Sequence, residues 1–417
     1  MSDKSKNTHC ILPYMHLYAE PTGLVKPCCI GGEFEDKLSL RDLSVEEAIN
    51  SPQMKQLRKD MSEGVRNSVC MVCYEREDRG ETSPRQNFNN NTLWKMPKVG
   101  KDFSVPKDAL QHIDIRFSNL CNFKCRMCGD QLSSSWESEN KIHKQPTDAW
   151  LQPNTRRKIT NFQTEVLEEE LQAAVDQGVI EEIYWVGGEP LMWERHWTIM
   201  QQLVDTGQSK DVVVRYNTNL SRTKYKNYDL YSMLDNFKNV NICASIDAIG
   251  DIGEYIRTGL KWPEFLQNFY DGMFLLDKYG HDAIVFDVTL TTPGLFGLKD
   301  MFDKVTELDV KSYFKFTYAF DPTKIIAPTA LPKSITIPYC QELIEYMEPR
   351  KTWKTQVYID SLKSLMERKS FDEEFPNYKE GLKRGKNQIL FLEKIRDQKL
   401  TFREILNEPA KEWWDGI

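Results

Sequence analysis

The chain has 417 residues, which is long enough for one large domain and one or two smaller ones. Hydrophobic residues make up 40% of it, so a sizeable core can form, and the net charge of −7 argues against nucleic acid as the main partner. The start, MSDKSKNTHC, lacks the apolar stretch of a signal peptide, and no apolar run reaches the roughly 18 residues of a membrane span. Ten cysteines in such a chain indicate metal ligands rather than disulfides, so we expect a cytoplasmic protein without membrane contact.

Five cysteines fall in the first hundred residues: Cys10, Cys28, Cys29, Cys70 and Cys73. A lone cysteine, a Gly-x4-Cys turn, a predicted helix and a closing C-x2-C pair follow one another, and this order resembles the auxiliary-cluster module of the SPASM and twitch families. Those families usually carry the module after a barrel domain, whereas here it comes first. The resemblance implies that Cys10, Cys28, Cys70 and Cys73 ligate a second 4Fe–4S cluster, with Cys29 as the spare thiol or as the replacement for Cys28. A zinc site with the same four ligands is the alternative.

Further along, strand-like segments alternate with helical ones, which predicts a parallel α/β fold. Strands buried on both faces would be apolar throughout, but here polar residues occupy every second position, as in residues 241–247 and 287–291. One polar face on several parallel strands predicts a sheet curved around a wet cavity, and we expect a partial (β/α)6 TIM-like barrel. The predicted strands are 111–118, 180–186, 211–217, 240–246, 284–290 and 312–318.

Three cysteines lie within eight residues directly after the first of these strands, at Cys121, Cys125 and Cys128 in the sequence CNFKCRMC. Soft thiolates select iron–sulfur clusters, zinc or copper(I), and three of them leave one iron of a cubane cluster open. This octapeptide resembles the cluster motif of the radical S-adenosylmethionine (SAM) enzymes. The resemblance implies that these cysteines hold a 4Fe–4S cluster whose free iron chelates SAM, and that Met127 lies near the adenine.

Other stretches fit SAM binding by the same resemblance. Gly187, Gly188 and Glu189 begin a GGEP turn after the second predicted strand, where the family contacts the methionine amino group through backbone carbonyls and sometimes the acid. Polar residues at the ends of the third and fourth strands, and an arginine shortly after, match positions that contact ribose or carboxylate. For the arginine, a place on the surface of a helix is an equal alternative. The polar residues are Asn219, Ser245 and Asp247, and the arginine is Arg257.

The resemblance implies an oxidoreductase or modifying enzyme that reductively cleaves SAM to a 5′-deoxyadenosyl radical, which abstracts hydrogen from a substrate. Auxiliary-cluster relatives often act on peptides or proteins, so a peptide or protein is the first substrate class. A sugar, nucleoside or other small molecule is the alternative. A reductant such as flavodoxin or ferredoxin would supply the electron. A non-catalytic iron–sulfur electron carrier or sensor and a zinc-stapled interaction module are the competing hypotheses.

Together these patterns divide the chain into four expected parts. The cysteine module spans residues 1–81, and a linker with little local structure follows over 82–108. The barrel spans 109–320. A mostly helical C-terminal extension covers 321–417, with Trp413 and Trp414 expected to dock onto the body of the protein.

Overall fold

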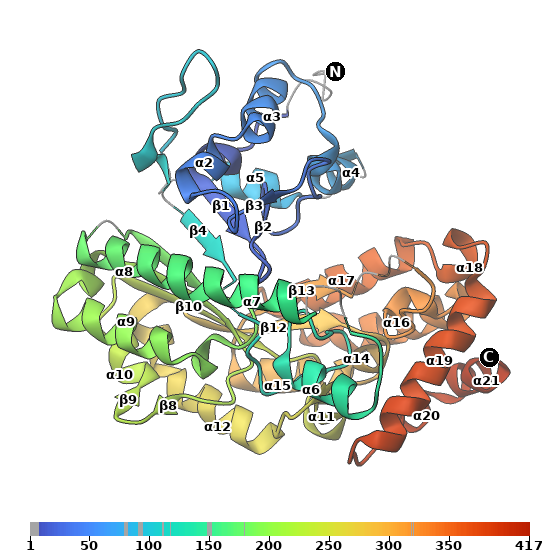
Figure 1. Ribbon diagram of the computed structural model, residues 1–417. Coiled ribbons are helices and arrows are strands. Elements are labelled where there is room, and N and C mark those ends of the chain that lie inside the picture. The colour runs from blue at the N-terminus through green and yellow to red at the C-terminus, as the bar shows by residue number, and fades with distance from the viewer. Residues whose placement is uncertain are drawn as a thin grey trace. The chain divides into compact units, whose positions relative to one another are not determined.

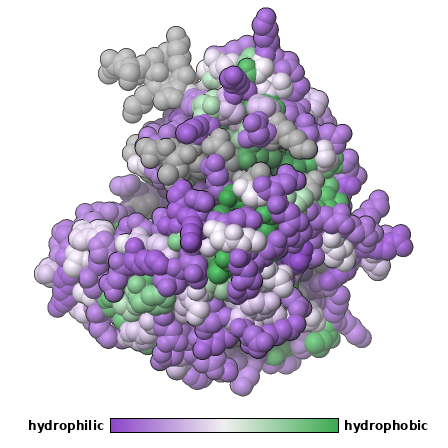
Figure 2. Space-filling model, turned by 90° about the vertical axis from the view of Figure 1, so that its left-hand side faces the viewer, coloured by the Kyte–Doolittle hydropathy of each residue, from purple (hydrophilic) through white to green (hydrophobic). Residues whose placement is uncertain are grey.

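The computed structural model describes residues 8–78, 82–90, 95–110, 112–116, 118–147, 152–178, 180–317, 319 and 321–417. The protein has a mixed α/β fold with a parallel-strand sheet (Figure 1). It divides into a first unit (Met1–Leu120, Asn140–Arg215 and Asn236–Lys238) and a second unit (Cys121–Glu139, Tyr216–Asp235 and Asn239–Ile417). None of the helices within the described ranges has the length and apolarity to cross a membrane. Hydrophilic residues cover most of the face seen in Figure 2.

The first unit contains a four-stranded sheet with the order β3-β2-β1-β4. The inner strand β1 pairs in parallel with β4, with Tyr18 opposite Asp114, and antiparallel with β2. The first strand predicted for the barrel is therefore β4, and it pairs with a strand of the cysteine module; Gln111 and Phe117 of that prediction lie outside the described residues. The bounds are β1 (His16–Ala19), β2 (Leu24–Lys26), β3 (Leu38–Ser39) and β4 (His112–Ile115).

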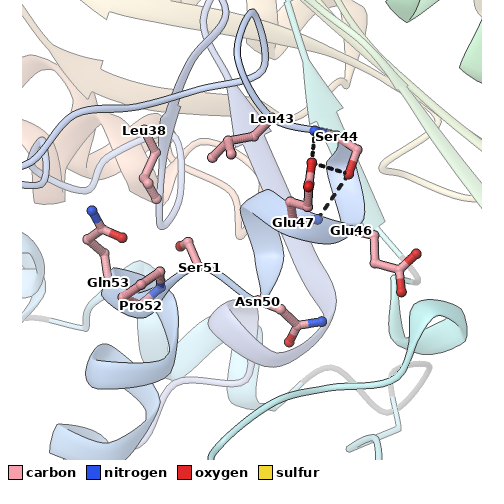
Figure 3. Close-up of a pocket in the computed structure, with 9 residues that line it drawn as sticks. All are labelled: Leu38, Leu43, Ser44, Glu46, Glu47, Asn50, Ser51, Pro52 and Gln53. Carbon is pink, nitrogen blue, oxygen red and sulfur yellow. Dashed lines mark hydrogen bonds between the residues drawn. The ribbon is translucent and has the colours of Figure 1, made fainter.

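Two short helices with separate N-caps stand where the sequence predicts one helix between the Gly-x4-Cys turn and the C-x2-C pair. Ser44 and Glu47 form a capping box, in which the Ser44 N–H donates to Glu47 Oε2 at 2.8 Å and the Glu47 N–H donates to Ser44 Oγ (Figure 3). A cap of this kind contributes about 1 kcal/mol. Ser51 then caps the next helix, which has Pro52 in its first turn, so the proline begins a second helix instead of kinking one. The two helices are α2 (Val45–Ile49) and α3 (Pro52–Ser62).

The segment expected to be a linker of little local structure contains a helix. Helix α5 (Pro84–Asn89) is capped by Ser83, whose hydroxyl accepts a hydrogen bond from the Gln86 N–H. This capping box, SPRQ, is the local signal that predicts the helix. The other helical segments of the first unit are α1 (Leu12–Met15), η2 (Ser68–Cys70), α4 (Met71–Asp78), η3 (Lys107–Ala109), α7 (Pro153–Asn161), η5 (Phe162–Leu167), α8 (Glu168–Asp176), η6 (Pro190–Met192), α9 (Glu194–Asp205) and η7 (Gln208–Asp211).

A five-stranded sheet has the order β13-β12-β10-β7-β6. Within the second unit, β10 pairs in parallel with β12, and β12 pairs in parallel with β13. One face of β10 carries Val240, Ile242 and Ala244, all buried, and its opposite face carries the polar residues, which confirms the predicted alternation. The five strands lie within two residues of their predicted ends: β6 (Glu182–Trp185), β7 (Val213–Thr218), β10 (Asn239–Ser245), β12 (Ile284–Leu290) and β13 (Ser312–Phe316).

The C-terminal extension is mostly helical, as predicted. Trp414 is buried and stacks on Phe402 with ring centroids 4.5 Å apart, so it packs against a neighbouring helix of the extension itself. The remaining elements are β5 (Lys124–Cys125), α6 (Ser134–Ile142), β8 (Lys224–Tyr225), β9 (Tyr228–Asp229), α10 (Leu230–Leu234), α11 (Gly250–Ile256), β11 (Arg257–Thr258), α12 (Trp262–Gly272), α13 (Phe274–Tyr279), α14 (Thr292–Phe296), α15 (Leu298–Leu308), η8 (Pro328–Ala330), α16 (Lys333–Met347), η9 (Glu348–Arg350), α17 (Gln356–Glu367), α18 (Phe371–Glu374), α19 (Tyr378–Ile395), α20 (Phe402–Ile405) and α21 (Glu408–Gly416).

Candidate functional site

The cysteine loop (Cys121–Cys128) is anchored by hydrogen bonds within the second unit. Its centre forms β5, which pairs antiparallel with β11 and places Cys125 opposite Arg257. Its start is held by α6, where the Ser135 hydroxyl donates to the Cys121 carbonyl at 2.8 Å. The Trp136 indole donates to the Cys125 carbonyl at 2.8 Å. Because the backbone is fixed at both points, the three thiols are presented from one ordered stretch.

The thiols of this loop differ in exposure. Cys125 is buried, whereas Cys121 and Cys128 are partly exposed. The Cys128 N–H donates to the Cys125 carbonyl at 3.0 Å, which closes a tight turn between these two residues. A hydrogen bond between the two side chains lowers the pKa of the Cys128 thiol and raises that of Cys125. The last two cysteines of the motif are therefore neighbours in space.

A buried ion pair lies directly beside the loop. Arg257 Nη2 donates to Asp247 Oδ1 at 2.9 Å, and Arg257 Nε lies 2.7 Å from Asp247 Oδ2. The Thr289 N–H also donates to Asp247 Oδ1, at 2.8 Å. Asp247 is 0% and Arg257 8% exposed, so the alternative of a surface arginine is wrong. Arg257 Nη1 lies 3.9 Å from the sulfur of Cys125, which brings a positive charge to the middle thiol of the motif.

Asn219 joins the cysteine loop through its neighbour Asn122. Asn219 Nδ2 donates to Asn122 Oδ1 at 3.0 Å, and Asn122 Nδ2 donates to the Ser221 hydroxyl at 3.0 Å. The loop is thus tied to the end of β7. Ser245 is partly buried on the polar side of β10, two residues before Asp247. The structure therefore brings the three cysteines, Met127, Asn219, Asp247 and Arg257 together around one loop.

The GGEP turn belongs to the first unit, where it packs against the chain just before the cysteine loop. Gly187 and Gly188 have positive φ values of 87° and 51°. A Cβ on Gly188 would lie 2.4 Å from the Leu120 carbonyl oxygen, so only glycine fits there. The Glu189 N–H donates to the same carbonyl at 2.7 Å, and its carboxylate accepts from the Leu191 N–H at 3.1 Å. The two glycines therefore allow a close backbone approach to residues 119–120.

Four of the five N-terminal cysteines line one pocket of the first unit: Cys10, Cys28, Cys70 and Cys73. Cys29 is exposed and is not among the residues that line this pocket. Burial raises the pKa of the Cys10 and Cys70 thiols to about 12.

Helix α5 adds a cation to this pocket. Arg85 is 3% exposed, lines the pocket, and is paired with the Glu77 carboxylate. Its Nη1 also donates to the His9 carbonyl, next to Cys10, at 2.5 Å.

Both cysteine sets can be tested for their fit to an iron–sulfur cluster. Within the parts of the chain that the structure describes, no group of three or more His, Cys, Asp or Glu side chains is placed to hold a single metal ion. The donors are nevertheless thiols alone, which suit iron–sulfur clusters. Arg257 lies beside the loop and Arg85 beside the N-terminal pocket, and a guanidinium stabilises the negative charge of metal-bound thiolates. The donor chemistry of both cysteine sets therefore fits such clusters.

Comparison with known proteins agrees with this chemistry. Residues 115–310 match the model of the Radical SAM superfamily. This stretch, slightly less than half of the chain, is therefore similar to radical SAM domains. No curated protein matches the chain. One solved structure that matches is anSMEcpe with bound AdoMet, with 16% sequence identity and a TM-score of 0.36 over 56% of this chain and 59% of that chain. Another is anSMEcpe with bound AdoMet and a Cp18Cys peptide, with 15% sequence identity and a TM-score of 0.35 over 56% of this chain and 58% of that chain. The match spans less than two thirds of either anSMEcpe chain.

Sequence reasoning missed several residues that hold the loop. Asn122 lies inside the motif but carries no family signal. Lys324 and Arg396 contact the loop from 197 and 272 residues away along the chain. A pair of glycines inside an otherwise helical segment, Gly381 and Gly385, is the one local sign of close packing in that region.

Proposed function

We propose that the chain is a radical SAM enzyme whose first 4Fe–4S cluster is held by Cys121, Cys125 and Cys128. The observation that carries the proposal is the anchored three-cysteine loop with a buried guanidinium 3.9 Å from its middle sulfur. When bound, the cluster and SAM supply the reductive cleavage that yields a 5′-deoxyadenosyl radical for hydrogen abstraction. The protein supplies orientation, charge and exclusion of water.

The chain's own residues have distinct roles in this proposal. Asp247 fixes the plane of the Arg257 guanidinium, because both oxygens of its carboxylate lie within 3 Å of the fork. Asn219 holds the loop through Asn122. The further SAM contacts are proposed from the family resemblance: Met127, Gly187, Gly188, Glu189, Asn219, Ser245, Asp247 and Arg257.

A second, fully ligated 4Fe–4S cluster is proposed for Cys10, Cys28, Cys70 and Cys73. Its support is the shared pocket of these four thiols and the buried Arg85 beside them. A closed cluster has no free iron for SAM, so it would carry electrons or shape the substrate entrance. The resemblance of this module to SPASM and twitch modules favours a peptide or protein substrate. The enzyme would act in the cytoplasm, with a flavodoxin or ferredoxin as its reductant. A sugar, nucleoside or other small molecule is the alternative substrate class.

Metal analysis tests both assignments. Protein purified and reconstituted without oxygen should bind about eight irons per chain, and Cys125→Ala or Cys73→Ala should each lose up to about four. Cys29→Ala is the matched control and should keep the full content. Zinc in the N-terminal pocket, or iron content that is the same in Cys125→Ala, would contradict the proposal.

A further inference from the structure

Two cations from beyond the family match reach the cysteine loop. Lys324 Nζ donates to the Met127 carbonyl at 3.0 Å, and Arg396 Nη1 donates to the Lys124 carbonyl at 3.0 Å. Met127 directly precedes Cys128, and Lys124 directly precedes Cys125. Each cation therefore holds the backbone one residue before a cysteine. The superfamily match ends at residue 310, so both donor side chains lie outside the matched stretch.

The Arg396 side chain is fixed by several contacts. It is 5% exposed, and its Nη2 donates to Glu139 Oε2 at 2.6 Å. Its guanidinium lies over the Trp136 ring at 4.3 Å, and the same indole donates to the Cys125 carbonyl. Arg396 Nη1 also donates to the Thr258 hydroxyl at 3.3 Å, on the strand that pairs with Cys125. One guanidinium thus joins β5, β11 and α6.

The segment that carries Lys324 packs against α19, the long helix drawn in red in Figure 1. Arg396 is the C-cap residue of this helix. A Cβ on Gly385 would lie 2.4 Å from the Thr323 carbonyl oxygen, and a Cβ on Gly381 would lie 2.3 Å from Pro322. Glycine weakens a helix interior relative to alanine, so two of them one turn apart need a packing reason. The close approach of residues 322–324 is that reason.

We propose that α19 is a brace for the cysteine loop, and that Lys324 and Arg396 are the positioning residues through which it acts. The glycine pair positions Lys324, and the C-terminal end of the helix positions Arg396. An extension that only covered the sheet would not need two donors aimed at the carbonyls before two cysteines. Lys324 also brings positive charge to the end of the loop that carries Cys128. This electrostatic part rests on the proposed function, because it needs a cluster on the loop.

Hydrogen exchange of the full chain without metal tests the brace itself. In Lys324→Met and in Gly385→Ala, the amides of residues 124–128 should exchange about tenfold faster than in the wild type. Lys399→Met is the matched control for the lysine, since Lys399 is exposed and pairs only with Asp251 and Glu254 in the contacts described.

Gly416→Ala is the control for the glycine, because a Cβ there meets nothing within 4 Å. Exchange in the loop that matches these controls in both variants overturns the proposal. Should Gly385→Ala fail to fold, Lys324→Met still decides.

The reduction potential of the cluster on the loop distinguishes an electrostatic effect of Lys324 from a purely structural one. Lys324→Met should lower this potential, because positive charge near a cluster favours its reduced form. Lys324→Arg keeps the charge and the donor and should restore the wild-type value. An unchanged potential in Lys324→Met, with the Lys399→Met control also unchanged, contradicts the electrostatic part. If the wild-type loop takes up no iron, the proposed function fails, while the exchange experiment still decides on the brace.

Discussion

Replacing Asp247 by asparagine removes the counter-charge of a buried arginine while it keeps the shape of the side chain. Arg257 Nη2 and Nε lie 2.9 and 2.7 Å from the two carboxylate oxygens, and asparagine retains one oxygen for the Thr289 N–H. Breaking a buried ion pair from one side costs about 3–5 kcal/mol. At roughly 2 °C per kcal/mol for a large unit, the melting temperature should fall by at least about 6 °C.

The assay is thermal and urea unfolding of the metal-free chain, followed by circular dichroism. Asp415→Asn is the matched control, because Asp415 also meets an arginine fork, with Arg403 Nε at 2.8 Å and Nη2 at 2.7 Å, but both side chains are 50% exposed. Solvent screens that pair, so the control should unfold like the wild type. If Asp247→Asn is as stable as Asp415→Asn, the buried charge pair does not hold the site as argued.

Three further predictions concern packing and burial. Gly188→Ala should destabilise the chain more than Gly207→Ala, since both positions have positive φ but only the first would press a Cβ against the Leu120 carbonyl; equal unfolding midpoints would contradict this. Burial lowers the pKa of His196 from 6.5 to about 3, so the unfolded chain binds the extra proton as pH falls below 6.5 and stability is lost there. Between pH 7 and 5.5 the loss is ~1.3 kcal/mol, and His196→Phe should remove it; an identical pH dependence in urea unfolding of both proteins refutes the assignment. Trp414→Ala should cost about 3–5 kcal/mol in the same urea unfolding experiment, and a cost below about 1 kcal/mol would show that the C-terminal helix does not dock firmly.

Local patterns predict much of this protein because they are set by neighbouring residues. The alternation of polar and apolar residues places β10 and β12 correctly, since a strand's two faces follow from a period of two. The resemblance of the N-terminal cysteines to an auxiliary-cluster module implies four ligands, and those four thiols, Cys10, Cys28, Cys70 and Cys73, line one pocket. The capping box at Ser44 predicts where α2 begins.

Long-range contacts could not be predicted in the same way. Nothing in the sequence near β4 indicates that it pairs with β1, almost a hundred residues earlier. Asp247 and Arg257 were each expected to meet SAM, and the structure pairs them with each other, because a buried guanidinium needs a counter-charge. Lys324 carries no motif, and its place beside the loop depends on α19 packing through Gly385. Such contacts are fixed by the tertiary fold.

Cleavage of SAM is the measurement that tests the central claim most directly. Reconstituted wild-type protein, incubated without oxygen with SAM and a strong reductant, should form 5′-deoxyadenosine, and Cys125→Ala should form none above background. Cys29→Ala, which changes a thiol outside both sites, should retain the wild-type rate. If the wild type gives no more 5′-deoxyadenosine than Cys125→Ala, the loop does not support radical SAM chemistry.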